Sequence, residues 1–190
     1  LQTLYWKQDT PYVSAMDFWE DTQKYIYLPR LVDSDVLDQT IQVVFNGEIY
    51  NHEQIRSELK DLGYKDWITD HSDTEVILKA FQEWGINCVK KFHGMFAIAL
   101  WDSKKQDLWL IRDRIGIKPL YYAVSEKRIV FASEIKAILS DPSYPRNVNE
   151  EAFFHYLSFL TTPAPLTLFE GINKLAAGTL LKVSSSGETK

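Results

Sequence analysis

Hydrophobic and polar positions change their spacing along the chain, and each spacing predicts a different element. Residues 41–45 form a short run of mainly β-branched and aromatic residues that leads into Asn46-Gly47, the pattern of a buried strand entering a turn. Apolar residues then recur at every third or fourth position over residues 51–62 and 72–84, which predicts two amphipathic helices. Each predicted helix starts at a polar capping pair and stops at a glycine: Asn51 with Gln54 and Gly63 for the first, Ser72 with Glu75 and Gly85 for the second.

The spacing becomes extended after residue 94. Residues 95–101 and 108–111 are apolar runs separated by a polar stretch, and residues 120–124 and 129–132 repeat this arrangement. We therefore expect two β-hairpins. The first strand of each hairpin is almost continuously apolar, which favours burial on both of its faces.

A short helix over residues 134–139, a helix from Asn149 to about residue 159 and a strand over residues 180–183 complete the prediction. No single period dominates residues 1–33, so we set the segment 1–40 apart from residues 41–190. Sheets flanked by helices predict an α+β fold in which two sheets pack together between helix layers.

The composition limits the classes of function that the chain can serve. Its 190 residues suit one domain, and 45% of them are hydrophobic, as in ordinary globular proteins. The net charge of −5, from 21 basic and 26 acidic residues, argues against binding to nucleic acid. No stretch reaches the roughly 20 apolar residues of a membrane span, and no signal peptide is recognisable. We therefore expect a cytoplasmic protein with no membrane partner.

Five short motifs occur in one order along the chain: FNGEIYN at residues 45–51, HSDTE at 71–75, GMFA at 94–97, RDRIGIKPLYY at 112–122 and ASEIKA at 132–137. Together they resemble the class II glutamine amidotransferases, and in particular the glutaminase domain of the glutamine-hydrolysing asparagine synthetases. The resemblance covers roughly residues 41–185. It implies an N-terminal-nucleophile fold, which is an αββα sandwich of two stacked, mainly antiparallel sheets between helix layers.

The resemblance also implies a site. Asn46 and Gly47 match the family's oxyanion hole, although an Asn-Gly pair on its own is more typical of a turn. Glu48 and Asp73 match positions that contact the substrate glutamine, with Asp73 pairing with the α-ammonium; an acid in the first turn of a helix also favours the helix dipole. Arg30, in a shortened echo of the family's arginine motif, is the candidate ligand for the α-carboxylate.

The family's nucleophile is a cysteine at the mature N-terminus, whose thiolate attacks the side-chain amide of glutamine. Position 1 of this chain is Leu1, and the single cysteine, Cys88, has the apolar surroundings of an inert core residue. We therefore expect this chain to be inactive as given. Three interpretations stay open: an incomplete piece of a working enzyme, a non-catalytic relative of the β-lactam synthetase type, or a standalone ligand-binding module.

The remaining expectations concern partners, cofactors and scaffold. The resemblance implies glutamine as ligand and a C-terminal synthetase domain that uses ATP and magnesium to amidate aspartate, beginning where this chain ends. The histidines show no metal-ligand spacing, so we expect no metal in this chain. A homodimer remains open. Arg112 and Asp113 are interpreted as a buried ion pair of the scaffold.

Overall fold

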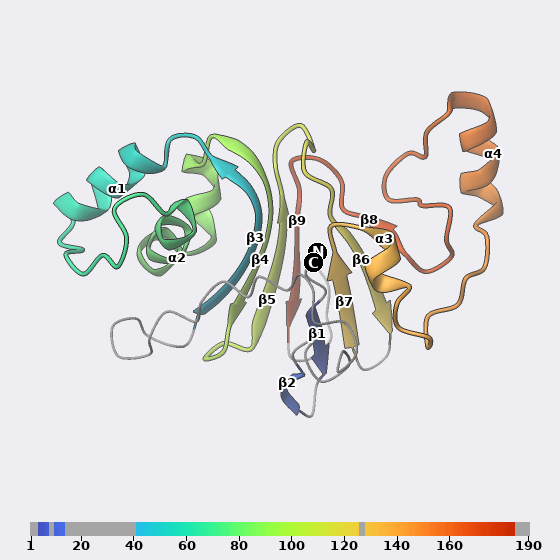
Figure 1. Ribbon diagram of the computed structural model, residues 1–190, viewed down its shortest axis with the longest axis horizontal. Helices are drawn as coiled ribbons and strands as arrows, with labels where there is room; N and C mark the ends of the chain where they lie inside the picture. Colours follow the sequence, from blue (N-terminus) through green and yellow to red (C-terminus); the bar gives the residue numbers. More distant parts are fainter. Residues whose placement is uncertain (1–3, 8–9, 14–40, 126–127, 185–190) are drawn as a thin grey trace.

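The molecule is built of four layers, with two β-sheets face to face and helices on both outer sides (Figure 1). The computed structural model describes residues 4–7, 10–13, 41–125 and 128–184. This arrangement confirms the predicted α+β class and the stacking of two antiparallel sheets between helix layers.

The first sheet has the order β3-β4-β5-β9, and every neighbouring pair is antiparallel. Its strands are β3 (Ile41–Ile49), β4 (Gly94–Asp102), β5 (Asp107–Arg112) and β9 (Leu180–Ser184). The prediction that a turn follows residue 45 is wrong, because β3 continues through Asn46 and Gly47 and the chain turns only at Tyr50. The physical reason is the partner strand, since β4 pairs with β3 residue by residue up to Ile49 opposite Gly94.

The second sheet has the order β2-β1-β7-β6-β8 and is also antiparallel. Its strands are β1 (Leu4–Lys7), β2 (Thr10–Val13), β6 (Tyr121–Ser125), β7 (Arg128–Ala132) and β8 (Asn173–Lys174). Both predicted hairpins are present, as β4–β5 in the first sheet and β6–β7 in the second. β1, β2 and β8 were not predicted, because such short strands carry too few residues to establish a period.

The helices separate into two layers. One layer, on the side of the first sheet, holds α1 (His52–Asp61), α2 (Asp73–Trp84) and the 3-10 helix η2 (Gly85–Lys91); the other holds α3 (Ile135–Ile138) and α4 (Glu150–Phe159) (Figure 1). Asn149 caps α4 as predicted, accepting the N–H of Ala152 at 2.9 Å. None of the helices in the described part of the chain is long and apolar enough to cross a membrane.

The predicted capping boxes form only in part. Ser72 accepts the N–H of Glu75 at 3.4 Å, but the Glu75 carboxylate bonds to the segment before Ser72. Asn51 makes no side-chain cap on α1. Its amide instead donates to the carbonyl of Lys91 and accepts the N–H of His93, which joins the start of α1 to the segment that enters β4.

In the part of the chain that the structure describes, three apolar cores lie between successive layers. Along β4, Phe96 and Ile98 face the helices, whereas Ala97 and Ala99 face the second sheet. A third core joins the outer face of the second sheet to α3. This explains why β4 is almost continuously apolar, and its predicted burial on both faces is confirmed. In β6 the prediction is only partly right, because Val124 is 48% exposed beyond the two residues that pair with β8.

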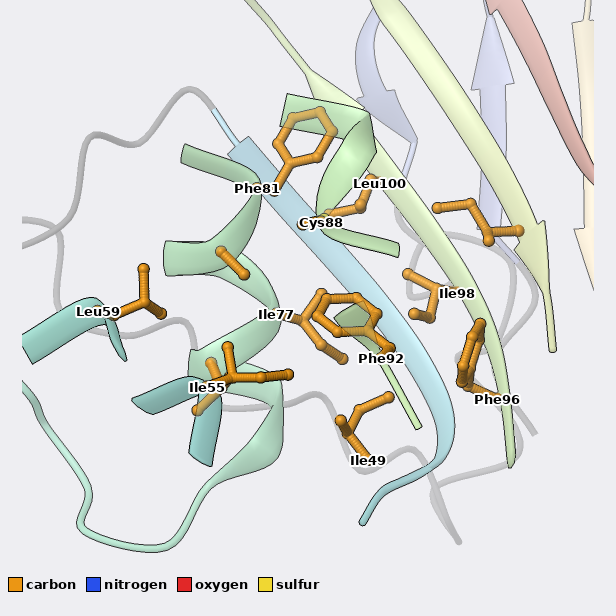
Figure 2. Close-up of a cluster of buried hydrophobic side chains, with 13 residues drawn as sticks. Ile49, Ile55, Leu59, Ile77, Phe81, Cys88, Phe92, Phe96, Ile98 and Leu100 are labelled. Atoms are coloured by element: carbon orange, nitrogen blue, oxygen red, sulfur yellow. The ribbon is translucent and has the colours of Figure 1, made fainter. Parts of the chain in front are cut away.

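The largest core fills the space between α1, α2, η2 and the first sheet (Figure 2). Cys88 lies inside it with Phe81 and Leu100, fully buried. The prediction that Cys88 is a core residue is therefore confirmed.

Candidate functional site

The predicted site residues lie around the last four residues of β3, at the edge of the first sheet. Asn46, Gly47 and Glu48 belong to the strand itself. Asp73 is the first residue of α2, and its carboxylate reaches the same end of the strand. Arg30 falls outside the described residues.

Asn46 faces the space between the two sheets. Side chains alternate along a strand, and Val44, two residues earlier, packs in the core between the sheets. In keeping with this direction, the Asn46 Nδ2 donates a hydrogen bond of 2.9 Å to the Oγ of Ser133, which follows β7 in the opposite sheet. Because an amide nitrogen carries two N–H groups, one remains for another acceptor.

Ser133 is a candidate site residue to which the sequence analysis assigned no role. It lies in the 132–137 motif, but 87 residues separate it from Asn46, and no spacing rule connects the two. Stacking of the two sheets creates the contact. The Asn46–Ser133 bond also orients the amide, since the hydroxyl of Ser133 accepts from Nδ2 and so fixes where that nitrogen lies.

Gly47 occupies a backbone position that other residues cannot take. Its φ is +151°, and a Cβ there would collide with the carbonyl oxygen of Met95 and come within 2.7 Å of the Phe96 Cα. Gly94 has the reciprocal problem against the carbonyl of Glu48. β3 and β4 therefore approach closely at this end because both strands have glycine there.

The register of the sheet determines where the N–H of Gly47 points. Gly47 is opposite Phe96, and Phe96 directs its backbone groups to the other neighbour: its carbonyl accepts from Asp113 N at 2.8 Å and its N–H donates to the Asp113 carboxylate at 3.3 Å. Gly47 and Phe96 therefore form a non-hydrogen-bonded pair, and the N–H of Gly47 points away from β4, toward the edge of the sheet.

Asp73 fixes the start of α2 to the end of β3. Its Oδ2 accepts the N–H of Ile49 at 3.1 Å, and Ile49 has the same phase along the strand as Gly47. Asp73 is half-buried, whereas Glu48, next to Ile49, is exposed. The carboxylate of Asp73 and the N–H groups of Gly47 and Ile49 thus share one edge of the sheet.

The structure does not join every predicted residue directly. Among the described residues, Asn46 and Asp73 make no hydrogen bond to each other; Asn46 is bonded to Ser133 and Asp73 to Ile49. The arrangement therefore offers an anionic group and two N–H donors distributed along a short stretch of strand. Such a set suits a small ligand with a cationic end and a carbonyl end.

The interpretation of Arg112 and Asp113 as an ion pair is wrong, because backbone groups satisfy both charges. The Arg112 guanidinium donates to three carbonyls, those of Lys118, Leu175 and Gly116. The Asp113 carboxylate accepts backbone N–H bonds from β4, at Phe96, and from the loop after β5, at Ile115, Ile117 and Lys118. Their scaffold role, holding the loop after β5 against β4, is supported.

The pKa of Asp113 lies below its ordinary value. Burial favours the neutral acid and would raise the pKa, but backbone N–H donors led by Lys118 and Ile117 stabilise the carboxylate and more than offset burial. Asp113 is therefore ionised and fully buried, and it bonds to Phe96, the residue that lies opposite Gly47.

Cys88 is unsuited to nucleophilic chemistry. Burial raises the pKa of its thiol to about 12, so the thiol is protonated at neutral pH. It lies in the core on the helix side of the first sheet, whereas Asn46 faces the second sheet. Within the described residues, no group of three His, Cys, Asp or Glu side chains is placed to hold a metal ion.

Comparison with known proteins identifies the family. The family model described as a glutamine amidotransferase domain matches residues 35–190. Glutamine-hydrolysing asparagine synthetase 3 of Bacillus subtilis is 37% identical over 149 residues, which cover 78% of this chain and 24% of the relative. A putative glutamine-hydrolysing asparagine synthetase of Methanocaldococcus jannaschii is 37% identical over 165 residues, covering 85% of this chain and 30% of the relative.

Solved structures support the same fold. The glutamine phosphoribosylpyrophosphate amidotransferase of B. subtilis superposes with a TM-score of 0.53 at 19% identity, covering 79% of this chain and 28% of that one. At this identity the likeness speaks for the fold alone, which is that of the N-terminal-nucleophile amidotransferases. The chain spans about a quarter of the length of the synthetases that it matches. The chain thus belongs to the glutamine amidotransferase domain family, with glutamine-hydrolysing asparagine synthetases among its relatives.

Proposed function

We propose that this chain is the glutamine-binding domain of an asparagine synthetase-like enzyme, in which glutamine is hydrolysed to supply ammonia for amidation of aspartate. The observation that supports the proposal is the end of β3, where the Asn46 amide, the outward N–H of Gly47 and the Asp73–Ile49 bond fall within four successive residues of the strand. The names and lengths of the relatives support a further synthetase domain. For that domain we propose ATP and magnesium as cofactors.

Each group has a defined task in this proposal. The Asp73 carboxylate pairs with the α-ammonium of glutamine, and the exposed Glu48 adds negative charge beside it. When a thiolate attacks the side-chain carboxamide carbon, the carbonyl oxygen becomes an oxyanion. The Asn46 Nδ2 and the Gly47 N–H donate to that oxyanion, and donors of this kind contribute about 2.7–4 kcal/mol each in related acyl transfers. The carbon–nitrogen bond then breaks, the nitrogen takes up a proton and leaves as ammonia, and water hydrolyses the remaining thioester to glutamate and the free thiol.

The attacking thiolate has to come from a group other than Cys88, the only cysteine of this chain. A second candidate function follows from the same observation: a non-catalytic relative that keeps the fold, as in the β-lactam synthetases, and binds glutamine or serves as a structural partner. Binding separates these possibilities, because recognition of the amino acid does not require the thiol.

Glutamine titration of the 190-residue chain tests the proposal. We expect weak, selective binding, in the range of ~1 mM, with glutamine preferred over glutamate and asparagine. Asp73→Asn keeps an acceptor for the Ile49 N–H but removes the charge, so the affinity should fall about ten- to a hundredfold. NMR titration measures the dissociation constant of glutamine for the unchanged chain and for the Asp73→Asn variant.

Asp70→Asn is the matched control, since Asp70 is a neighbouring acid whose side chain is 95% exposed. Its substitution should leave glutamine binding unchanged. Equal binding of the three amino acids, or an Asp73→Asn variant that binds like the unchanged chain, would contradict the proposal and favour the purely structural alternative.

A further inference from the structure

α1 and α2 bury three charged side chains to which the proposed chemistry gives no role. Arg56 and Glu75 are each 5% exposed, and Lys79 is 3% exposed. Burying a charge is costly unless the group is paired or hydrogen-bonded. The bonds that these three residues make therefore indicate what they hold in place.

All three direct their polar groups at one segment, residues 66–72. Arg56 donates to the carbonyls of Thr69, at 2.5 Å, and Ser72, at 2.8 Å. Glu75 accepts the N–H groups of Ile68, at 2.8 Å, and Thr69, at 3.0 Å, and also the Thr69 hydroxyl. Such charge-assisted bonds are the strong class of protein hydrogen bonds.

Lys79 and Trp67 complete the arrangement. Lys79 donates to the carbonyl of Asp66 at 2.6 Å. Both cations contact the Trp67 ring, whose centre is 4.1 Å from the Arg56 guanidinium carbon and 5.0 Å from the Lys79 Nζ. Side chains of α1 and α2 thereby hold the backbone of four residues of this segment and contact the ring of Trp67.

Residues 66–72 have no helix or strand of their own, and the segment ends directly before Asp73. Arg56 holds Ser72, the residue next to Asp73, and Glu75 belongs to the first turn of the same helix. The Asp73–Ile49 bond of 3.1 Å is near the long end of the normal range, so a shift of about 1 Å in the segment would break it.

We propose that Arg56, Glu75 and Lys79 are positioning residues that hold the Asp73 carboxylate at the edge of β3, where it receives the ammonium group of the ligand. This inference rests on the proposed function for its ligand, but not for its geometry. The three buried charges act through the 66–72 segment and touch no ligand themselves.

Amide hydrogen exchange tests the geometry without any ligand. In Arg56→Met, Glu75→Gln and Lys79→Met, the Ile49 amide should lose protection by about tenfold or more, as it should in Asp73→Ala. The neighbouring Tyr50 amide, which donates to His93 at 2.8 Å and not to Asp73, should keep its protection. In Arg56→Lys, which retains the positive charge, the protection of the Ile49 amide should lie between that of the unchanged chain and that of Arg56→Met. Lys60→Met on the exposed side of α1 is the matched control.

Ligand selectivity tests the consequence. The unchanged chain should prefer glutamine over glutaric acid monoamide, which lacks the α-ammonium, by about tenfold or more. The three variants should lose this preference by weakening glutamine binding while binding of the monoamide stays the same. Substitution of a residue that only supports the fold would weaken the binding of both ligands to the same extent.

The outcomes separate the two ideas. Failure of the unchanged chain to bind glutamine overturns the proposed function, while Ile49 exchange still decides the positioning. Equal loss of protection at Ile49 and Tyr50 overturns the inference, because the charges then support the fold as a whole. So does a set of variants with normal Ile49 protection. If Arg56→Met does not fold, Lys79→Met and Arg56→Lys carry the test.

Discussion

One amide and one carboxylate carry most of the candidate chemistry, and among the described residues each is fixed by a single hydrogen bond. Ser133 fixes the Asn46 amide from the opposite sheet, and the Ile49 N–H fixes Asp73. Both bonds leave capacity unused, because an amide nitrogen has a second N–H and a carboxylate has further lone pairs. At the scale of the residue, both side chains are therefore oriented and each keeps hydrogen-bonding capacity for a further partner.

Replacing Ser133 tests the orientation of Asn46. Ser133→Ala removes the acceptor of a partly buried bond, so the free energy of unfolding should fall by about 1 kcal/mol. The side-chain amide signals of Asn46 should also shift and exchange faster in NMR spectra. Ser133→Thr keeps the hydroxyl and should preserve both. Ser140→Ala removes an exposed hydroxyl bond and is the control. An unchanged Asn46 signal in Ser133→Ala would contradict the assignment.

Cys88 provides a second test at this scale. With a thiol pKa of about 12 and full burial, it should resist thiol reagents at pH 7 until the protein unfolds. The 190-residue chain should release no ammonia from glutamine above background. Ammonia assays and thiol titration in native and denaturing buffer measure this. Ammonia release that disappears in Cys88→Ala would show that the buried thiol is the nucleophile after all.

Among the elements, the β3–β4 pair defines the site. Its two glycines face the partner backbones so closely that neither strand accepts a Cβ there. The register of this pair directs the Gly47 N–H outward, while Asp113 bonds to the backbone groups of Phe96 on the other side. The strand register and the Asp113 carboxylate together therefore determine the direction of the Gly47 N–H donor.

Gly47→Ala tests the close approach. Its methyl group would meet the Met95 carbonyl and the Phe96 Cα, so the strands must separate, with a loss of about 1–3 kcal/mol or more in the free energy of unfolding. Gly63→Ala is the control, because Gly63 has a φ of +101° but open space around the new methyl group, so only backbone strain is added. Urea unfolding compares them. Similar losses in both variants would mean that backbone strain, and not strand contact, matters at Gly47.

At the scale of the whole molecule, three apolar cores and two buried carboxylates hold the described elements together. For both Asp113 and Asp141 burial raises the pKa, but hydrogen bonds reverse this and lower it below the ordinary value. At Asp141 these come from Ser143 and Arg128. Because the charged form is favoured in the folded state, each group stabilises the fold at neutral pH.

The stability should therefore depend on acid in a defined direction. The two carboxylates contribute fully to the free energy of unfolding when the pH is above the pKa of an aspartate in the unfolded chain, about 3.9. This contribution is lost as the pH falls through their lower pKa values in the folded state. Urea unfolding at pH 7, 5, 4 and 3 should show little change down to about pH 4 and a decline below it. Asp113→Asn should lower the free energy of unfolding by about 1–3 kcal/mol at pH 7 and flatten the decline. A decline of unchanged size in Asp113→Asn would contradict this origin.

Much of this architecture could be predicted from the sequence because it is local. The hairpins, the helices over residues 52–61, 73–84 and 150–159 and the burial of β4 follow from the period of apolar residues. The family follows from the order of five motifs. Asn46, Gly47, Glu48 and Asp73 were identifiable as candidates by matching those motifs, without any knowledge of their distances.

The tertiary structure alone decided how these groups are connected. A period describes which face a residue takes, but not which distant backbone lies opposite, so nothing local indicated that β3 continues through Asn46-Gly47 or that Asn51 bonds to residues 91 and 93. Nor could it indicate that backbone groups, and not each other, satisfy Arg112 and Asp113. The Asn46–Ser133 bond and the three buried charges behind Asp73 exist only once sheets and helices pack, because hydrogen bonds depend on positions in space and not on separation along the chain.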